Sequence, residues 1–145
     1  MMDLKHILEE AKIIAVVGCS DQPWRPSYRI SEYLIDAGYT MIPVNPEHET
    51  VHGLHCYPDL ESIPDDVRID IVNVFRHPRF TANHVRKTVE RARATGTKPV
   101  IWTQIGVSSP EAQRLAEEAG LPYVSNRCIL VEHSRLGVGA IGSEQ

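Results

Sequence analysis

The sequence contains few cysteines, and none of them belongs to a recognisable pair. Cys19, Cys56 and Cys128 are far apart, their number is odd, and no CxxC motif occurs. Disulfide frameworks of small secreted domains need paired cysteines, whereas isolated cysteines are typical of chains kept in a reducing compartment. The cysteine pattern therefore predicts free thiols and a cytoplasmic protein.

Long apolar runs and long basic runs are also missing. No segment approaches the roughly 18 consecutive apolar residues of a membrane-spanning helix, and residues 1–12 carry acids but no apolar core of a signal peptide. Lys and Arg number 15 against 19 Asp and Glu, the formal net charge is −4, and the charges are scattered. These features argue against a membrane protein and against a general nucleic-acid binder.

Several short enzyme motifs are absent as well. The chain has no GxSxG nucleophile elbow and no P-loop GK[ST]. Residues 16–27, VVGCSDQPWRPS, follow an apolar run where a nucleotide-binding α/β protein has its phosphate loop. This segment holds one glycine where the dinucleotide fingerprint needs three.

Alternating strand and helix patterns run through the rest of the chain. Apolar, β-branched runs predict strands at 13–17, 40–44, 69–75, 98–102 and 121–124, with a shorter strand near 54–57. Helical spacing predicts helices at 3–11, from Ser27 to Ala37, from Thr81 as N-cap to Gly96, from 108 to 120 and from 128 to 136, with one helical turn at 59–63.

This alternation predicts a single α/β domain over residues 1–145, a Rossmann-like three-layer domain with a mostly parallel sheet flanked by helices. We expect its core to span about residues 12–136 and its C-terminal tail, 137–145, to be mobile. Pro43 predicts that the strand at 40–44 lies at an edge, because proline lacks a ladder donor. In such folds the ligand lies beyond the carboxyl ends of the strands, here residues 18–20, 44–46, 75–77 and 103–106.

The loop after the first strand is suited to an anion. The helix beginning near Ser27 offers unpaired backbone N–H groups and a partial positive charge. Gly18 permits close approach of a ligand, Cys19 and Ser20 add N–H groups, and Arg25 can form a bidentate bond with a phosphate. The sequence thus favours an extended, phosphate-bearing ligand, and a plain surface loop with Trp24 as a lid is the alternative.

NAD fits this chain less well. Its ribose is usually held by an acid at the end of the second strand, where this chain has Val44-Asn45-Pro46. Together with the missing glycines, this lowers the rank of NAD without excluding it.

Five segments together resemble a known family. They are VVGCSDQPWRPS, GYTMIPVNPEHETVHGLHCYPDL, NVFRHP, WTQIGVSSPE and SNRCILVEH. In order and spacing they resemble the small stand-alone CoA-binding proteins of bacteria and archaea, which are similar to the CoA-binding domain of succinyl-CoA synthetase α-subunits. The resemblance covers about residues 12–136.

The resemblance implies that coenzyme A or an acyl-CoA binds at the strand ends. Gly18, Cys19 and Ser20 would line the phosphate loop, with Arg25 near a phosphate. The adenosine end would be bordered by Val44, Asn45 and Pro46. The cleft wall would include Phe75 and Arg76. The pantetheine arm would be met by Gln104, Ile105 and Gly106. The phosphohistidine of the synthetases lies in a second domain, for which this chain is too short, so the resemblance implies binding rather than ligase chemistry.

Other residue groups suggest further chemistry. Cys128 follows the last strand and could face the cleft as a reactive thiol, although a packing role is favoured for it and for Cys19. The histidines at 48, 52 and 55 match no zinc pattern and are interpreted as solvated loop residues. Glu132 and His133 are adjacent and are interpreted as a surface helix end rather than as a base and its orienting group.

Two classes of function remain. We expect a protein that binds coenzyme A or an acyl-CoA without catalysis of its own. The alternative is an enzyme, either an NAD(P)-dependent oxidoreductase or a thiol-dependent CoA enzyme. A bound metal ion and a nucleic-acid partner are not expected.

Overall fold

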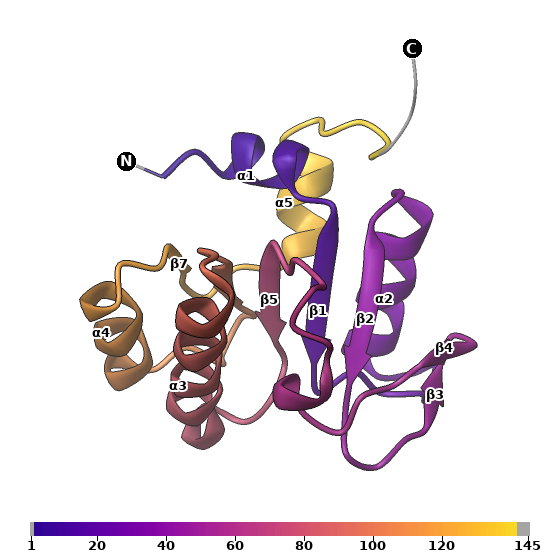
Figure 1. Ribbon diagram of the computed structural model, residues 1–145. Coiled ribbons are helices and arrows are strands. Elements are labelled where there is room, and N and C mark those ends of the chain that lie inside the picture. The colour runs from indigo at the N-terminus through magenta and orange to yellow at the C-terminus, as the bar shows by residue number, and fades with distance from the viewer. Residues whose placement is uncertain (1, 142–145) are drawn as a thin grey trace.

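A parallel five-stranded sheet forms the centre of the computed structural model, which describes residues 2–141 (Figure 1). Its strand order is β2-β1-β5-β6-β7, and all neighbouring strands are parallel. The bounds are Ile13–Val17 for β1, Thr40–Val44 for β2, Ile71–Val74 for β5, Val100–Thr103 for β6 and Tyr123–Val124 for β7. The predicted three-layer α/β fold is confirmed, and Pro43 lies on an edge strand as its missing donor requires.

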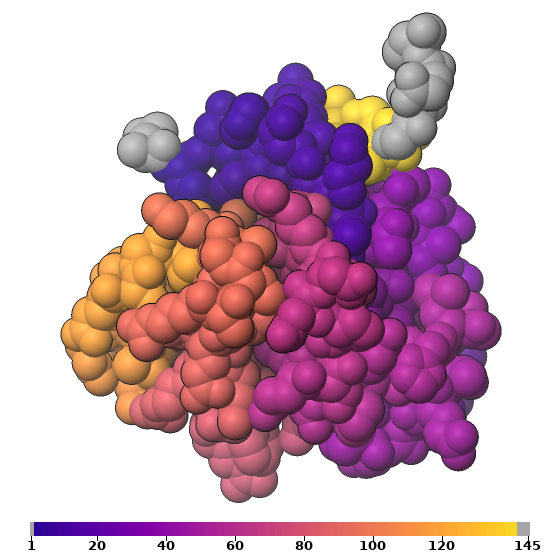
Figure 2. All heavy atoms as spheres, in the orientation of Figure 1, coloured from indigo at the N-terminus to yellow at the C-terminus, as the bar shows by residue number. Residues whose placement is uncertain are grey.

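Helices cover both faces of this sheet. The helices on one face are α1 (Leu4–Glu10), α2 (Pro26–Asp36) and α5 (Ile129–Arg135), and those on the other are α3 (Pro78–Thr95) and α4 (Pro110–Glu118). The short helix η1 (Leu60–Ser62) packs against α3. Figure 2 shows the N-terminal helix α1 next to the C-terminal segment at one end of the molecule.

Strand β1 shows why the sheet is buried on both sides. Ile14 and Val16 belong to the core shared with α1, α2 and α5, whereas Ala15 and Val17 belong to the core on the opposite face. All four are essentially inaccessible to solvent. The continuous apolar run of β1 thus matches a central parallel strand, and the chain reverses its direction of winding between β1 and β5, where a ligand cleft is expected.

Helix α3 begins earlier than the sequence predicts. Its N-cap is His77, whose Nδ1 accepts a hydrogen bond from the N–H of Arg79 at 3.1 Å, and Pro78 occupies the first turn. The prediction of Thr81 as the N-cap is therefore wrong. The Thr81 hydroxyl is fully buried and donates to the Val107 carbonyl at 2.7 Å, so it ties α3 to the segment after β6.

The short strand predicted near 54–57 belongs to a separate hairpin. Strands β3 (Thr50–Val51) and β4 (Leu54–His55) pair antiparallel, outside the main sheet. His52 and Gly53 form its turn with φ values of 55° and 74°, as a tight hairpin turn requires. The sequence analysis missed β3 because two residues are too few to show a period.

The start of the C-terminal tail contacts the rest of the chain. Val138 is buried, and the N–H of Ile141 donates to the carbonyl of Ala37 at 2.6 Å. The rest of the tail predicted to be mobile, 142–145, lies outside the described residues. No helix within residues 2–141 has both the length and the apolar character that crossing a membrane requires.

Candidate ligand-binding cleft

A cleft of about 570 Å³ opens at the carboxyl ends of the strands, between the loop after β1 and the segments that follow β2, β5 and β6. This volume is in the range of small-molecule sites. Nine of the predicted site residues line it: Gly18, Ser20, Arg25, Ser27, Asn45, Phe75, Arg76, Gln104 and Ile105.

Four predicted residues do not line the cleft. The Cys19 side chain is fully buried in the core beneath the loop. Val44 and Pro46 instead line a second cavity of about 180 Å³, whose wall also includes Arg76. Gly106 is exposed beyond β6, where its N–H donates to Asn126 Oδ1 at 2.6 Å.

The cleft also holds six residues that were not named as site residues, although His77 falls within the strand end predicted at 75–77. They are Gln22, Pro26, Glu47, His48, His77 and Val107. Gln22 and Pro26 lie inside the predicted loop, and the others fall one or two residues from predicted positions. Proximity in sequence was the available signal, but which side chain of a turn faces inward depends on the hydrogen bonds of that turn.

The loop between β1 and α2, called the phosphate loop for its predicted role, binds its first N–H groups to acceptors within the protein. Gly18 donates to the Val44 carbonyl at 2.8 Å, Cys19 to the same carbonyl at 3.4 Å, and Ser20 to the Ser27 hydroxyl at 3.0 Å. The N–H groups of Cys19 and Ser20 were expected to face a ligand, and the structure gives each a protein acceptor instead. These bonds hold the loop in shape, and the first-turn N–H groups of α2 remain without partners inside the helix.

Two arginines provide the positive charge of the cleft. Arg25 is the N-cap of α2, makes no side-chain cap bond, and is exposed with its Nε 3.4 Å from Gln22 Oε1. Arg76 stacks its guanidinium over the Phe80 ring, 4.8 Å from the centroid, and lines both cavities. Stacking limits the freedom of Arg76, so a ligand meets a cation that is already oriented.

Beyond β2 the cleft is lined by one acidic residue, Glu47, and by His48. Asp21 Oδ1 lies 3.5 Å from His48 Nε2. Asn45 organises this corner: its Nδ2 donates to the Cys19 carbonyl at 3.1 Å, and its Oδ1 accepts from the Glu47 N–H at 2.9 Å. The cleft lining thus includes two arginines and one carboxylate.

The cysteines differ in accessibility. Burial raises the pKa of the Cys19 thiol to about 11, although its bond with the Ser31 hydroxyl at 3.4 Å acts the other way. Burial likewise raises the pKa of Cys56. Cys128 is half-buried, packs against the main core and is not among the cleft-lining residues. All three are free thiols.

The loop histidines have separate partners. His52 Nε2 lies 2.9 Å from the Ser31 hydroxyl, and the His55 ring packs edge-on against Tyr57. Within residues 2–141, no three His, Cys, Asp or Glu side chains gather in a way that could hold a metal ion.

The interpretation of Glu132 and His133 as a surface helix end is wrong, because both are buried. Glu132 pairs with Arg135 at 2.6 Å and Arg127 at 3.4 Å, and the hydrogen bond from Arg135 lowers its pKa. His133 Nδ1 lies 2.8 Å from the Tyr33 hydroxyl, and burial lowers its pKa. The two residues make separate contacts, so they do not act as a pair.

A doubly wound parallel sheet with a cleft at its reversal point defines a Rossmann-like α/β domain. The family described as "CoA binding domain" matches residues 12–134, and the chain belongs to this family. It is 38% identical over 132 residues to the uncharacterized protein YneT of Bacillus subtilis, covering 91% of this chain and 93% of YneT.

Two further relatives place the domain among stand-alone and multidomain proteins. The solved structure of a hypothetical protein from Pyrococcus horikoshii superposes with a TM-score of 0.85 at 40% identity, covering 92% of this chain and 89% of that chain. The ADP-forming acetate–CoA ligase I of Archaeoglobus fulgidus is 26% identical over 135 residues. That match covers 89% of this chain but 19% of the ligase.

Proposed function

We propose that this protein binds coenzyme A, or an acyl-coenzyme A, in the cleft at the carboxyl ends of the strands, without catalysis of its own. The observation that carries the proposal is the pair of arginines, Arg25 and Arg76, that line the cleft of a chain belonging to the CoA-binding family. The diphosphate of coenzyme A needs such charge-assisted donors. The first-turn N–H of Ser27, which has no partner within the helix, is a third donor for the same group.

The far end of the cleft fits the pantetheine arm. Gln104 Oε1 is buried and has no hydrogen-bond partner among residues 2–141. A buried acceptor without a partner is costly, and an amide N–H of pantetheine would satisfy it. Beside it, Ile105 offers an exposed apolar side chain to the alkyl part of the arm. The residues present therefore suit both the charged and the neutral portions of the ligand.

The enzyme alternatives receive less support. A thiol-dependent reaction needs an accessible thiolate, whereas Cys19 is buried with a raised pKa and Cys128 lies outside the cleft lining. An NAD-dependent reaction would gain from Glu47 but lacks the glycines that admit the pyrophosphate. We further place the protein in the cytoplasm, because its cysteines are free thiols.

Mass spectrometry of the natively purified protein tests the ligand. We expect a mass addition that matches coenzyme A or an acyl-CoA, either retained from the cell or restored by adding coenzyme A. The variant carrying both Arg25→Ala and Arg76→Ala should keep its fold by circular dichroism and lose the addition. An adduct of NAD in place of coenzyme A would overturn the proposal.

A further inference from the structure

The corner of the cleft beyond β2 carries a carboxylate, that of Glu47, on a hydrogen-bonded turn. Glu47 lies three residues past Val44, the last residue of β2, and faces the cleft. Its N–H donates to Asn45 Oδ1, and the N–H of Asn45 itself donates to the Tyr57 carbonyl at 2.8 Å. This turn is also bonded to the phosphate loop through Asn45 Nδ2 and the Cys19 carbonyl. The backbone of Glu47 is therefore held next to the phosphate loop.

Neighbouring groups do not neutralise this carboxylate. The adjacent imidazole of His48 has its Nε2 3.5 Å from Asp21 Oδ1, and no ion pair between His48 and Glu47 is found within residues 2–141. Within residues 2–141, no ion pair joins Glu47 to Arg25 or Arg76.

The second cavity offers no spare cation on the same side. Lys87 in its wall is bound to Glu61 at 3.0 Å, and Asp59 adds a further carboxylate. Arg76, which is common to both cavities, lies after β5 and stacks on Phe80. The side of the site beyond β2 is thus acidic in both cavities, whereas the positive charge belongs to the phosphate loop and to the end of β5.

In doubly wound folds an acid beyond the second strand accepts hydrogen bonds from ribose hydroxyls. A phosphate monoester on that ribose would instead face the Glu47 carboxylate, and like charges in contact repel. We propose that Glu47 is a specificity-determining residue, which binds the ribose hydroxyls of an adenosine diphosphate ligand and selects against a 3′-phosphate. This inference rests on the proposed coenzyme A site, and it predicts that the form lacking the 3′-phosphate, dephospho-coenzyme A, is the better ligand.

Calorimetric titration with the two ligands tests the inference. We expect dephospho-coenzyme A to bind the wild type roughly fivefold to tenfold more tightly than coenzyme A, the scale of one close like-charge contact at the surface. Glu47→Gln keeps the shape and removes the charge, so the two affinities should become nearly equal. Glu47→Lys should reverse the preference. Glu49→Gln is the matched control, because Glu49 is exposed and does not line the cleft, and it should leave the ratio unchanged.

The outcomes separate the two proposals. If coenzyme A binds the wild type as tightly as dephospho-coenzyme A, or if Glu47→Gln leaves the ratio unchanged, Glu47 does not determine specificity while the coenzyme A site stands. If neither ligand binds the wild type, the proposed function itself fails, and the inference fails with it.

Discussion

The side chain of Arg76 lies where a side chain on Gly18 would begin. A methyl group built on Gly18 would come within 2.8 Å of Arg76 Cδ and 3.2 Å of its Cγ. Gly18 also has a φ of +86°, which residues with a side chain adopt only at a cost. The single glycine of the phosphate loop therefore serves two purposes: it turns the chain after β1, and it lets the aliphatic stem of Arg76 pack across the backbone toward Phe80.

Gly18→Ala should accordingly weaken both folding and ligand binding. Backbone strain should lower the free energy of unfolding by about 1–2 kcal/mol, and displacement of Arg76 should weaken coenzyme A binding by roughly tenfold, as for a lost charge-assisted bond. Denaturant unfolding and calorimetric titration measure the two effects. Gly96→Ala is the control, because Gly96 has a φ of +68° with no atom within 4 Å of an added methyl. It should lose stability and keep full affinity, and a Gly18→Ala protein that also keeps full affinity would contradict the role given to Arg76.

Arg25 provides a prediction about charge. If its guanidinium binds a phosphate, Arg25→Ala should lose about 1.5–3 kcal/mol of binding free energy. Added salt should weaken ligand binding by the wild type more than by the variant, because the variant has already lost the charge interaction that salt screens. Arg29→Ala, one turn further along α2 and outside the cleft lining, should leave both quantities unchanged. Equal losses in the two variants would point to a general charge effect instead of a phosphate contact.

Buried His133 should make stability depend on pH. Burial lowers its pKa below 6.5 in the folded protein, so the unfolded chain binds a proton more readily than the folded one. The contribution of neutral His133 to the free energy of unfolding should therefore be complete above pH 6.5. It should be lost as the pH decreases through 6.5 toward the folded-state pKa. His84 has a pKa lowered mainly by burial and contributes with the same sign.

His133→Gln tests this assignment. Glutamine can keep a bond to the Tyr33 hydroxyl but does not titrate, so denaturant unfolding between pH 7 and pH 5 should show a smaller loss of stability than in the wild type. The remaining slope should shrink further when His84→Gln is added. A slope unchanged by His133→Gln would mean that other groups cause the pH dependence.

The sequence predicted the layers of this fold well because its strands and long helices are encoded locally. The apolar run of β1 and the proline of β2 each specify a position in the sheet, and the structure confirms both. The start of α3 was mispredicted because His77 and Thr81 are both plausible caps. In the structure His77 accepts the capping bond from Arg79, and the Thr81 hydroxyl donates to the Val107 carbonyl instead of capping the helix.

The cleft was less predictable than the fold. Its strand-end residues follow from topology, so Arg76 and Gln104 could be placed in advance. Glu47 could not, because its direction depends on Asn45 bonding to Cys19 and to the Glu47 backbone across a turn. The same bonds occupy the side-chain amide of Asn45, a residue that the family resemblance implied at the adenosine end.

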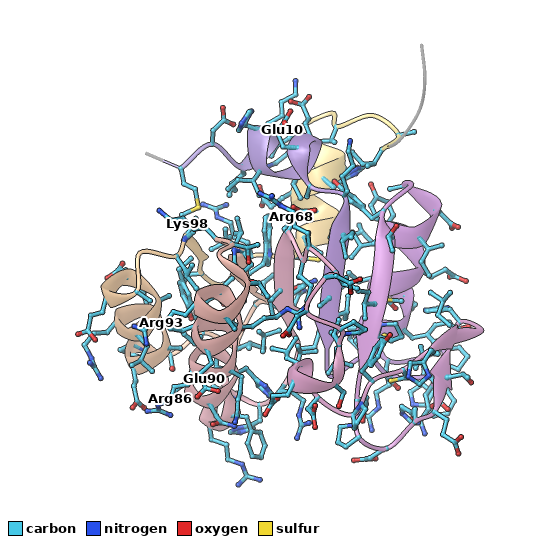
Figure 3. All side chains as sticks on the ribbon, in the orientation of Figure 1. Glu10, Arg68, Arg86, Glu90, Arg93 and Lys98 are labelled. Atoms are coloured by element: carbon cyan, nitrogen blue, oxygen red, sulfur yellow. The ribbon has the colours of Figure 1, made fainter. Side chains whose placement is uncertain are left out.

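Arg91 holds the segment around η1 against α3. Its guanidinium donates to the carbonyls of Ile63 at 2.8 Å, Pro64 at 2.7 Å and Val67 at 2.8 Å, and its side chain is 9% exposed. Arg91→Ala would leave these carbonyls without their donor, so we expect the free energy of unfolding to fall by about 2–4 kcal/mol. Arg93→Ala, an exposed position on the same helix (Figure 3), should change it by less than about 0.5 kcal/mol. Denaturant unfolding measures both variants. Equal free energies of unfolding for Arg91→Ala and Arg93→Ala would contradict the stabilising role of Arg91.

Calorimetric titration of the wild type with coenzyme A and with NAD, under identical buffer and salt, tests the central claim most directly. The two ligands share an adenosine diphosphate. They differ in the pantetheine arm, proposed to contact Gln104 and Ile105, and in the 3′-phosphate, which coenzyme A carries and NAD lacks, so dephospho-coenzyme A is titrated alongside them to isolate the effect of the arm. We predict saturable, stoichiometric binding of coenzyme A and binding of NAD at least about tenfold weaker, which corresponds to one unsatisfied buried acceptor. Binding of NAD as tight as that of coenzyme A, or no binding of coenzyme A, would contradict the account.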